Sequence, residues 1–410
     1  MGEQDLPSQT SRTRPQSRRR RRGRRQGQGR RGLAAAAAAA LTGCVLATGL
    51  LAPPAAFAAA RPDPGRQRPV RPDPVRQGLD ALVRDDGLPA ALASVTDAAG
   101  RTRTYTAGVG DLATGSQVPT DGQVRVGSNT KTFTAVAVLQ LVGEGRIRLD
   151  APVDAYLPGL LRGEGIDGRR IKVRELLQQT SGLPDYTRAD LAPRYYAPRE
   201  LVGFALRYKA DFDPGTRWAY SNTNYVLAGL IVEEVTGHPL SEELDRRIIR
   251  RIGLRHTYFP APGDATIREP HPRGYYRDSA DAPLSDVTET DPSWGWAAGQ
   301  MISTNSDLNR FFTELLGGGL LPPAQLAQMR TTVPAGYPFD PRARYGLGLV
   351  STPLSCGGVF WGHGGSFPGY ETRGGVTDTG RAAAVAVTAR PPDAAGMKRF
   401  EHLVDTALCR

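Results

Sequence analysis

One stretch constrains the fold more than any other: residues 126–145, which read VGSNTKTFTAVAVLQLVGEG. After a polar start, this stretch is apolar for most of ten residues. A helix that is apolar on nearly all sides is stable only when other elements cover it. The sequence therefore predicts a buried helix here. Ser128 and Lys131 at its start are either a nucleophile and its base on one helical turn, or an N-cap and a solvated first-turn side chain.

The positive charge lies mainly in the first part of the chain. The chain of 410 residues has a formal net charge of +11, yet residues 1–58 alone hold 11 Arg, no Lys and two acidic residues. The remainder is close to neutral. A folded surface without excess positive charge does not attract a polyanion, so we predict no nucleic-acid partner.

The first 58 residues have the pattern of an export signal. An Arg-rich segment precedes an Ala-rich apolar segment, and small residues around Ala56–Ala58 fit a cleavage site near Ala58. Arg30-Arg31 also fits a twin-arginine signal. We favour cleavage over two alternatives. One is lipidation of Cys44, which lies in a lipoprotein-like box, and the other is an uncleaved N-terminal anchor. We expect a secreted protein on the cell-wall side of the membrane.

The cysteines agree with an oxidising compartment. If Cys44 leaves with the signal, Cys356 and Cys409 remain as an even pair, for which we favour a disulfide over two free thiols. The five His residues are scattered and none has the spacing of a metal ligand set. We therefore predict neither a metal nor a cofactor.

The order of the elements predicts one folded domain. Residues 59–76 contain RPDP twice and have little that can pack, so they read as a linker. Residues 77–410 form strand-like segments at both ends and helical segments between them. This order predicts an α+β domain: an antiparallel sheet flanked by helices, with a mostly helical insertion.

Ser128 and Lys131 have the arrangement that serine chemistry requires. A serine hydroxyl needs a base within hydrogen-bond reach, and a spacing of three residues on a helix supplies one. Lysine acts as a base only when its pKa falls, and the neighbouring apolar residues favour that fall by excluding water. A single Ser-x-x-Lys is weak evidence by itself, so the assignment depends on the other motifs.

Two further segments supply the missing groups. Tyr220-Ser221-Asn222 begins a helix, where a phenol beside Lys131 can share its proton and an amide can hold a substrate. His363-Gly364-Gly365-Ser366 follows a strand-like segment, where missing side chains let a substrate backbone approach and the Ser366 N–H meets an oxyanion.

Taken in order, SNTK, YSN and HGG resemble the three motifs of the serine penicillin-recognising enzymes, in the branch of class C β-lactamases and DD-peptidases. Across residues 77–410 the chain looks like the Streptomyces-type secreted D-alanyl-D-alanine carboxypeptidases. This resemblance rests on the segments LLQQTSGLPDY, PGTRWAYSNTNYVLAGLIVEEVTG and GHGGSFPGY. It implies the β-lactamase/transpeptidase-like fold.

The resemblance also implies roles for individual residues. Ser128 would attack the substrate carbonyl and form an acyl-enzyme, while Lys131 and Tyr220 would exchange the proton. The N–H groups of Ser128 and Ser366 would form the oxyanion hole, and Asn222 would hold the substrate amide.

The third motif and one aromatic residue complete the expected substrate site. His363 would keep the site electropositive and coupled to Tyr220, with Gly364 and Gly365 beside the substrate. Trp294 resembles an aromatic residue that lines the cleft, and a core Trp is the alternative.

Two departures from the family pattern bear on the substrate. Relatives that cut a terminal D-Ala often have a hydroxyl residue where Gly364 stands, and Val350 and Ser351 replace an expected charged partner for a carboxylate. Arg373 could substitute, although we expect it to be solvated. The first expectation is a DD-carboxypeptidase, and possible transpeptidase, acting on peptidoglycan stem peptides or a related small acyl donor, with β-lactams as inhibitors.

Three other readings stay open. The same fold and chemistry serve a class C-like β-lactamase, and also an esterase or D-amino-acid peptidase. The third is a binding module for cell-wall peptides or β-lactams without turnover. Intact Ser128, Lys131 and Tyr220 argue against the binding module. We expect a monomer.

Overall fold

The computed structural model describes residues 73–279 and 282–410. The predicted export signal and most of the predicted linker lie outside the described residues. The chain divides into two units, Met1–Gln67 and Arg68–Arg410, and the described residues all belong to the second. Helix α1 starts at Pro74, so residues 74–76, expected in the linker, are helical. Among the described residues, no helix combines the length and apolarity needed to span a membrane.

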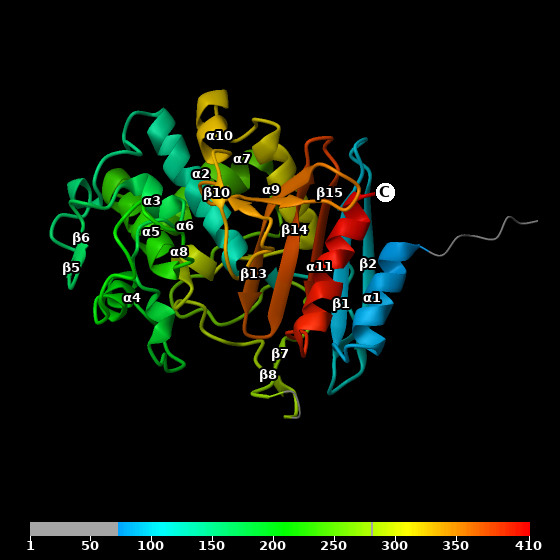
Figure 1. Ribbon diagram of the computed structural model, residues 1–410. Coiled ribbons are helices and arrows are strands. Elements are labelled where there is room, and N and C mark those ends of the chain that lie inside the picture. Colours follow the sequence, from blue (N-terminus) through cyan, green and yellow to red (C-terminus); the bar gives the residue numbers. More distant parts are fainter. Residues whose placement is uncertain (1–72, 280–281) are drawn as a thin grey trace, which may run out of the picture. The chain divides into compact units, whose positions relative to one another are not determined.

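Both ends of the chain build one antiparallel sheet. Its nine strands follow the order β10-β11-β12-β13-β14-β15-β1-β2-β3 (Figure 1). The early strand β1 pairs with the last strand β15, with Ala91 opposite Val387. The strands are β1 (Ala90–Thr96), β2 (Thr102–Asp111), β3 (Ser116–Gln117), β10 (Val333–Pro334), β11 (Arg344–Tyr345), β12 (Val350–Pro353), β13 (Val359–Phe367), β14 (Tyr370–Thr377) and β15 (Ala382–Val387).

Helices cover both faces of the sheet. Alternate side chains of a strand point to opposite faces, and in β15 Ala383 and Val385 pack in one core while Ala384 and Ala386 pack in another. The first core lies under α1 (Pro74–Arg84) and α11 (Ala394–Leu408), which stand side by side in Figure 1. The second lies under α9 (Asn305–Leu316) and contains the long apolar helices of the insertion.

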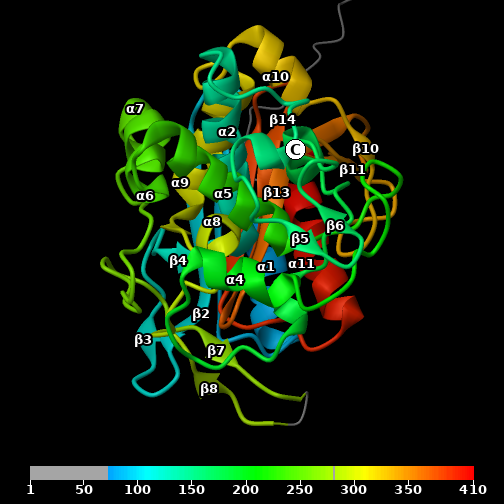
Figure 2. The same cartoon turned by 90° about the vertical axis from the view of Figure 1, so that its left-hand side faces the viewer.

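The insertion between β3 and β10 is mostly helical, as predicted (Figure 2). Its helices are α2 (Thr130–Gly143), α3 (Val173–Leu177), α4 (Pro198–Ala205), α5 (Asn222–Thr236), α6 (Leu240–Leu244), α7 (Arg250–Ile252), α8 (Trp296–Gly299), α9 and α10 (Pro323–Met329). Its strands pair as β4 (Val124–Arg125) with β9 (Ile302–Ser303), β5 (Arg162–Gly163) with β6 (Ile166–Asp167), and β7 (Tyr275–Tyr276) with β8 (Ser285–Asp286). The predicted fold class is confirmed.

Helix α2 is buried on every side, which explains its uniformly apolar sequence. Phe133 stacks on Phe311 of α9 with ring centroids 3.7 Å apart. The other long apolar helix, α5, ends at Gly237. The φ of Gly237 is +74°, a left-handed conformation that glycine adopts most easily. Because α2 and α5 are both buried, their first turns are held in place by the surrounding core. Lys131 in the first turn of α2 and Asn222 in the first turn of α5 therefore have fixed positions.

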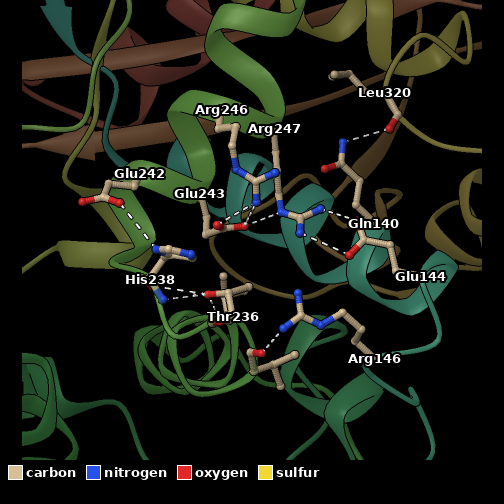
Figure 3. A network of polar contacts seen from close by, with 12 residues as sticks. Gln140, Glu144, Arg146, Thr236, His238, Glu242, Glu243, Arg246, Arg247 and Leu320 are labelled. Atoms are coloured by element: carbon tan, nitrogen blue, oxygen red, sulfur yellow. Dashed lines mark hydrogen bonds and ion pairs between the residues drawn. The ribbon is translucent and has the colours of Figure 1, made fainter. Parts of the chain in front are cut away.

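A polar network fastens the far end of α2 to the segment between α6 and α7. That segment, Asp245–Ile249, is a π-helix, and its Arg247 bonds to Glu243 and to Glu144 at the end of α2 (Figure 3). The side chains of Glu243 and Arg247 are 1% and 7% exposed. A buried carboxylate is stable only when paired, so this network fixes the helix that carries Lys131.

Candidate active site

Ser128 lies at the junction between β4 and α2, in the short 3₁₀ turn η1 (Gly127–Asn129). Gly127 has a φ of +49°, and a Cβ on it would lie 2.7 Å from the Ser366 carbonyl oxygen and 2.8 Å from the Ser366 nitrogen. Contacts that short are not tolerated, so only glycine allows β13 to approach the turn this closely. The first and third motifs meet at this point.

Lys131 is buried and makes three hydrogen bonds. Its Nζ donates to the Ala298 carbonyl oxygen at 2.8 Å and to Asn222 Oδ1 at 2.7 Å, and lies 2.9 Å from Ser128 Oγ. Burial lowers the pKa of Lys131 to about 7, and the charge of Asp185 opposes that fall. A neutral amine has two N–H groups, which the two carbonyl oxygens occupy, so its lone pair faces the Ser128 hydroxyl.

Tyr220 lies on the other side of the serine. Both residues line the same cleft, and Lys131 Nζ stands 4.9 Å from the Tyr220 ring centroid. Burial raises the pKa of Tyr220 well above its usual value. Tyr220 is therefore a neutral phenol at neutral pH, a group that can relay or donate a proton next to the nucleophile.

Asp185 orients Asn222 and was not identified from the sequence. Its Oδ2 accepts the backbone N–H of Asn222 at 3.0 Å and the side-chain Nδ2 at 2.9 Å. Because Nδ2 faces the carboxylate, Oδ1 faces Lys131. In the sequence, Asp185 is marked only by its place in the segment TSGLPDY. Its contact with Asn222, 37 positions away, arises from tertiary folding and cannot be inferred from the spacing of the two residues.

His363 does not carry the positive charge that we expected. It is 3% exposed, and burial together with the charges of Lys131 and Arg373 lowers its pKa to about 3. Its Nδ1 lies 2.5 Å from the Gly364 carbonyl oxygen, which can only accept, so Nδ1 carries the proton and Nε2 accepts from the Tyr345 hydroxyl at 3.1 Å. The prediction of an electropositive His363 was wrong because burial of the imidazole disfavours its cation.

Gly364, Gly365 and Ser366 run along the floor of the site on β13. A Cβ on Gly365 would lie 1.9 Å from the Val126 carbonyl oxygen, so that position requires glycine. The side chain of Arg373 fills the space beside Gly364, and its guanidinium bonds to Glu371 at 3.2 Å. The expectation that Arg373 is solvated was wrong: its side chain is 21% exposed, because β14 places it opposite Gly364.

One cleft of 1320 Å³ brings the predicted site residues together. Trp294 forms part of its wall and stacks on Phe367, with ring centroids 5.1 Å apart. It is thus a half-buried cleft residue and not a core Trp. The predicted residues that line the cleft are Ser128, Tyr220, Asn222, Trp294, His363, Gly364, Gly365 and Ser366.

The wall beside Tyr220 is aromatic. The Tyr220 ring packs against Phe339 and Trp218, with centroid distances of 5.9 Å and 6.5 Å. These rings lie against Val350 in one small apolar cluster. No charged side chain stands at positions 350 and 351, as the sequence indicated.

Two other predictions concern residues outside the catalytic cluster. Cys356 and Cys409 are joined by a disulfide, with their Cα atoms 5.7 Å apart. Within the ranges 73–279 and 282–410, His, Cys, Asp and Glu form no group of three or more that could hold a metal ion.

Comparison with known proteins gives the family. The Beta-lactamase family model matches residues 73–407. Penicillin-binding protein 4 of Amycolatopsis lactamdurans is 30% identical over 251 residues, which are 60% of this chain and 64% of that protein. The chain thus spans less than two thirds of that relative's length.

Solved structures of similar proteins match more of the chain. A D-stereospecific amidohydrolase from Streptomyces sp. is 40% identical with a TM-score of 0.74, covering 80% of this chain and 97% of that one. A D-amino acid amidase from Ochrobactrum anthropi SV3 is 28% identical with a TM-score of 0.73, covering 81% and 96%. With its three motifs in one cleft and a family model that matches nearly all of the described residues, the chain belongs to the Beta-lactamase family.

Proposed function

We propose that this protein is a D-stereospecific amidohydrolase that cleaves amides or short peptides of D-amino acids through an acyl-enzyme on Ser128. The similarity to the Streptomyces amidohydrolase and the Ochrobactrum amidase supports a D-amino-acid amide or peptide as the acyl donor. This reading takes the place of the D-alanyl-D-alanine carboxypeptidase that we expected first.

Acylation follows from the contacts of Ser128. The neutral amine of Lys131 takes the hydroxyl proton as Oγ forms a bond to the substrate carbonyl carbon. The carbonyl oxygen becomes an oxyanion between the N–H groups of Ser128 and Ser366, whose backbones are brought together at Gly127. Asn222 and Asp185 hold Lys131 in place from the other side.

Tyr220 completes the proton transfer. The nitrogen of the scissile amide must gain a proton before the C–N bond breaks, and the phenol beside Ser128 can donate one and regain it from Lys131. Water then attacks the acyl-enzyme with the same groups acting in reverse. The products are a D-amino acid and an amine or ammonia.

The aromatic wall beside Tyr220 is the observation that favours this substrate. Because Tyr220 donates to the leaving nitrogen, the leaving group departs along the surface of Phe339, Trp218 and Val350. The carboxylate of a D-Ala leaving group would lose hydration against these rings, and Arg342 at the edge of the cleft already pairs with Asp340 at 3.0 Å, so the carboxylate would gain little in return. Ammonia or an uncharged amine meets no such cost.

The test compares donors with the same purified protein. We expect ammonia release from D-amino-acid amides, with little D-Ala release from an acyl-D-Ala-D-Ala peptide. Preferential D-Ala release would show the carboxypeptidase instead. Rapid turnover of a penicillin adduct would show a β-lactamase, and turnover of esters alone an esterase. Lys131→Ala should abolish every one of these activities.

We further propose that the protein is exported and acts on the cell-wall side of the membrane, and that β-lactams acylate Ser128. The Arg-rich, Ala-rich first 58 residues support export. The similarity to a penicillin-binding protein supports acylation by β-lactams.

A further inference from the structure

The peptide unit between Gly365 and Ser366 has a charged hydrogen-bond donor on its carbonyl. Arg373 Nη1 donates to the Gly365 carbonyl oxygen at 3.2 Å, and Thr372 Oγ1 lies 3.4 Å from the same oxygen. In a trans peptide the N–H points opposite to the C=O. The Gly365 carbonyl faces β14, so the Ser366 N–H faces Gly127 and the turn that carries Ser128.

A cation on the carbonyl strengthens the N–H at the other end of the same peptide unit. Hydrogen bonds in a chain polarise one another, and a charged donor polarises more than a neutral one. The Ser366 N–H is the group that receives the oxyanion in the proposed reaction. Its strength as a donor therefore affects the transition state more than the bound substrate.

The neighbours of Arg373 hold it for this contact. Its guanidinium also donates to the Thr372 carbonyl at 2.9 Å and pairs with Glu371 at 3.2 Å and Glu401 at 3.6 Å. Glu371 in turn accepts from Ser366 Oγ at 2.5 Å. These carboxylates offset much of the charge of Arg373, so the directed hydrogen bond carries the main part of its effect on the oxyanion.

The glycine in the middle of the third motif makes this arrangement possible. Gly364 is the cross-strand partner of Arg373, and a Cβ on Gly364 would lie 2.8 Å from Arg373 Cδ. Any side chain at position 364 must therefore displace the arginine. The absence of a hydroxyl residue there is thus coupled to the presence of Arg373.

We propose that Arg373 is a positioning residue of the oxyanion hole, which polarises the Gly365–Ser366 peptide and for which Gly364 leaves room. This inference rests on the proposed function, since it concerns the same oxyanion site.

The test measures transition-state and ground-state binding separately. In Arg373→Met we expect kcat for a D-amino-acid amide to fall roughly tenfold with KM changed by less than about twofold. Affinity for a boronic acid analogue, whose tetrahedral adduct places an oxygen in the hole, should fall by the same factor. Affinity for the intact amide, measured in the Ser128→Ala background, should change by less than about twofold when Arg373→Met is added. Arg373→Lys should recover most of the loss.

Gly364→Ala and Arg330→Met serve as the second variant and the control. Gly364→Ala displaces only a flexible side chain and should reproduce the Arg373→Met effect. The guanidinium carbon of Arg330 lies 4.5 Å from the ring centroid of Trp361, a residue of β13, and Arg330 pairs with Asp378. Arg330 does not line the cleft, so Arg330→Met should keep kcat. Unchanged kcat in Arg373→Met, or a parallel loss of affinity for the intact amide in the Ser128→Ala background, would overturn the proposal.

A separate reaction distinguishes failure of this inference from failure of the proposed function. Acylation of Ser128 by a labelled penicillin uses the same oxyanion hole but needs no D-amino-acid amide. If the wild type turns over no such amide, the proposed function fails, and the ratio of acylation rates between wild type and Arg373→Met still decides the role of Arg373.

Discussion

Lys131 sets the pH dependence expected of this enzyme. Its pKa lies at about 7 because burial disfavours the ammonium, and only the neutral amine can take the Ser128 proton. We therefore expect the acylation rate to rise with pH, with a midpoint of about 7. Rates of acylation by a labelled penicillin between pH 5 and 9 measure this. A rate that is flat or falls over that range would contradict the role of Lys131 as base.

Asp185 should tune that midpoint. Its negative charge favours the ammonium of Lys131 and so raises the lysine pKa. Asp185→Asn removes the charge and keeps an oxygen for the N–H groups of Asn222. The midpoint of the pH–rate profile should therefore move to lower pH. Asp190→Asn, on an exposed position of the same segment, is the control and should leave the midpoint in place. A shift upward would refute the electrostatic account.

Only part of the site could be predicted residue by residue. Ser128 in the turn η1 and Lys131 at the start of α2 are three positions apart in consecutive helical turns, so local spacing indicates their contact. Asp185 reaches Asn222 across 37 positions and Glu371 reaches Ser366 across a hairpin, and such contacts depend on tertiary packing. The neutral state of His363 was missed for a related reason, since its burial follows from neighbours on other elements.

At the scale of elements, the network around Arg247 should stabilise α2. Arg247→Met leaves Glu243 with only one partner, and a buried carboxylate that loses a partner costs about 3 kcal/mol. We expect a lower free energy of unfolding in urea. The control is Arg250→Gln, at the start of α7 with a side chain that is 70% exposed, which should change stability by less than about 0.5 kcal/mol. Equal stability of both variants would show that the network contributes nothing.

The elements themselves were predictable to different degrees. The helix predicted from the apolar run behind Ser128 is α2, and the helix predicted to begin at Tyr220–Asn222 is α5. The sequence of residues 241–251 reads as one continuous helix, but the structure has α6, a π-helix and α7 in succession there. Hydrophobic periodicity cannot reveal such an inserted residue, because the pattern of apolar positions changes by only one step.

At the scale of the whole molecule, strands at both ends of the chain correctly predicted one sheet. Their order could not be predicted, because β1 pairs with β15 through contacts nearly 300 positions apart, which nothing local in the sequence specifies. The expected monomer stays a prediction.

The disulfide between Cys356 and Cys409 should stabilise the whole domain. It spans 53 positions and ties the end of α11 to the turn between β12 and β13. Closing a loop of that size restricts the unfolded chain and contributes about 2–4 kcal/mol. The variant with both cysteines changed to Ser should therefore melt at lower temperature and keep its kcat at 25 °C. An unchanged melting temperature would contradict this contribution.

The central claim is that Ser128 carries the acyl group of a D-amino acid. The direct measurement is peptide mass spectrometry after acid quenching of the enzyme during turnover of a D-amino-acid amide. We predict a D-aminoacyl adduct on the peptide that contains Ser128, absent with the L-enantiomer and absent in Ser128→Ala, which should also release no ammonia. Turnover that persists in Ser128→Ala, or an adduct on another residue, would contradict the account.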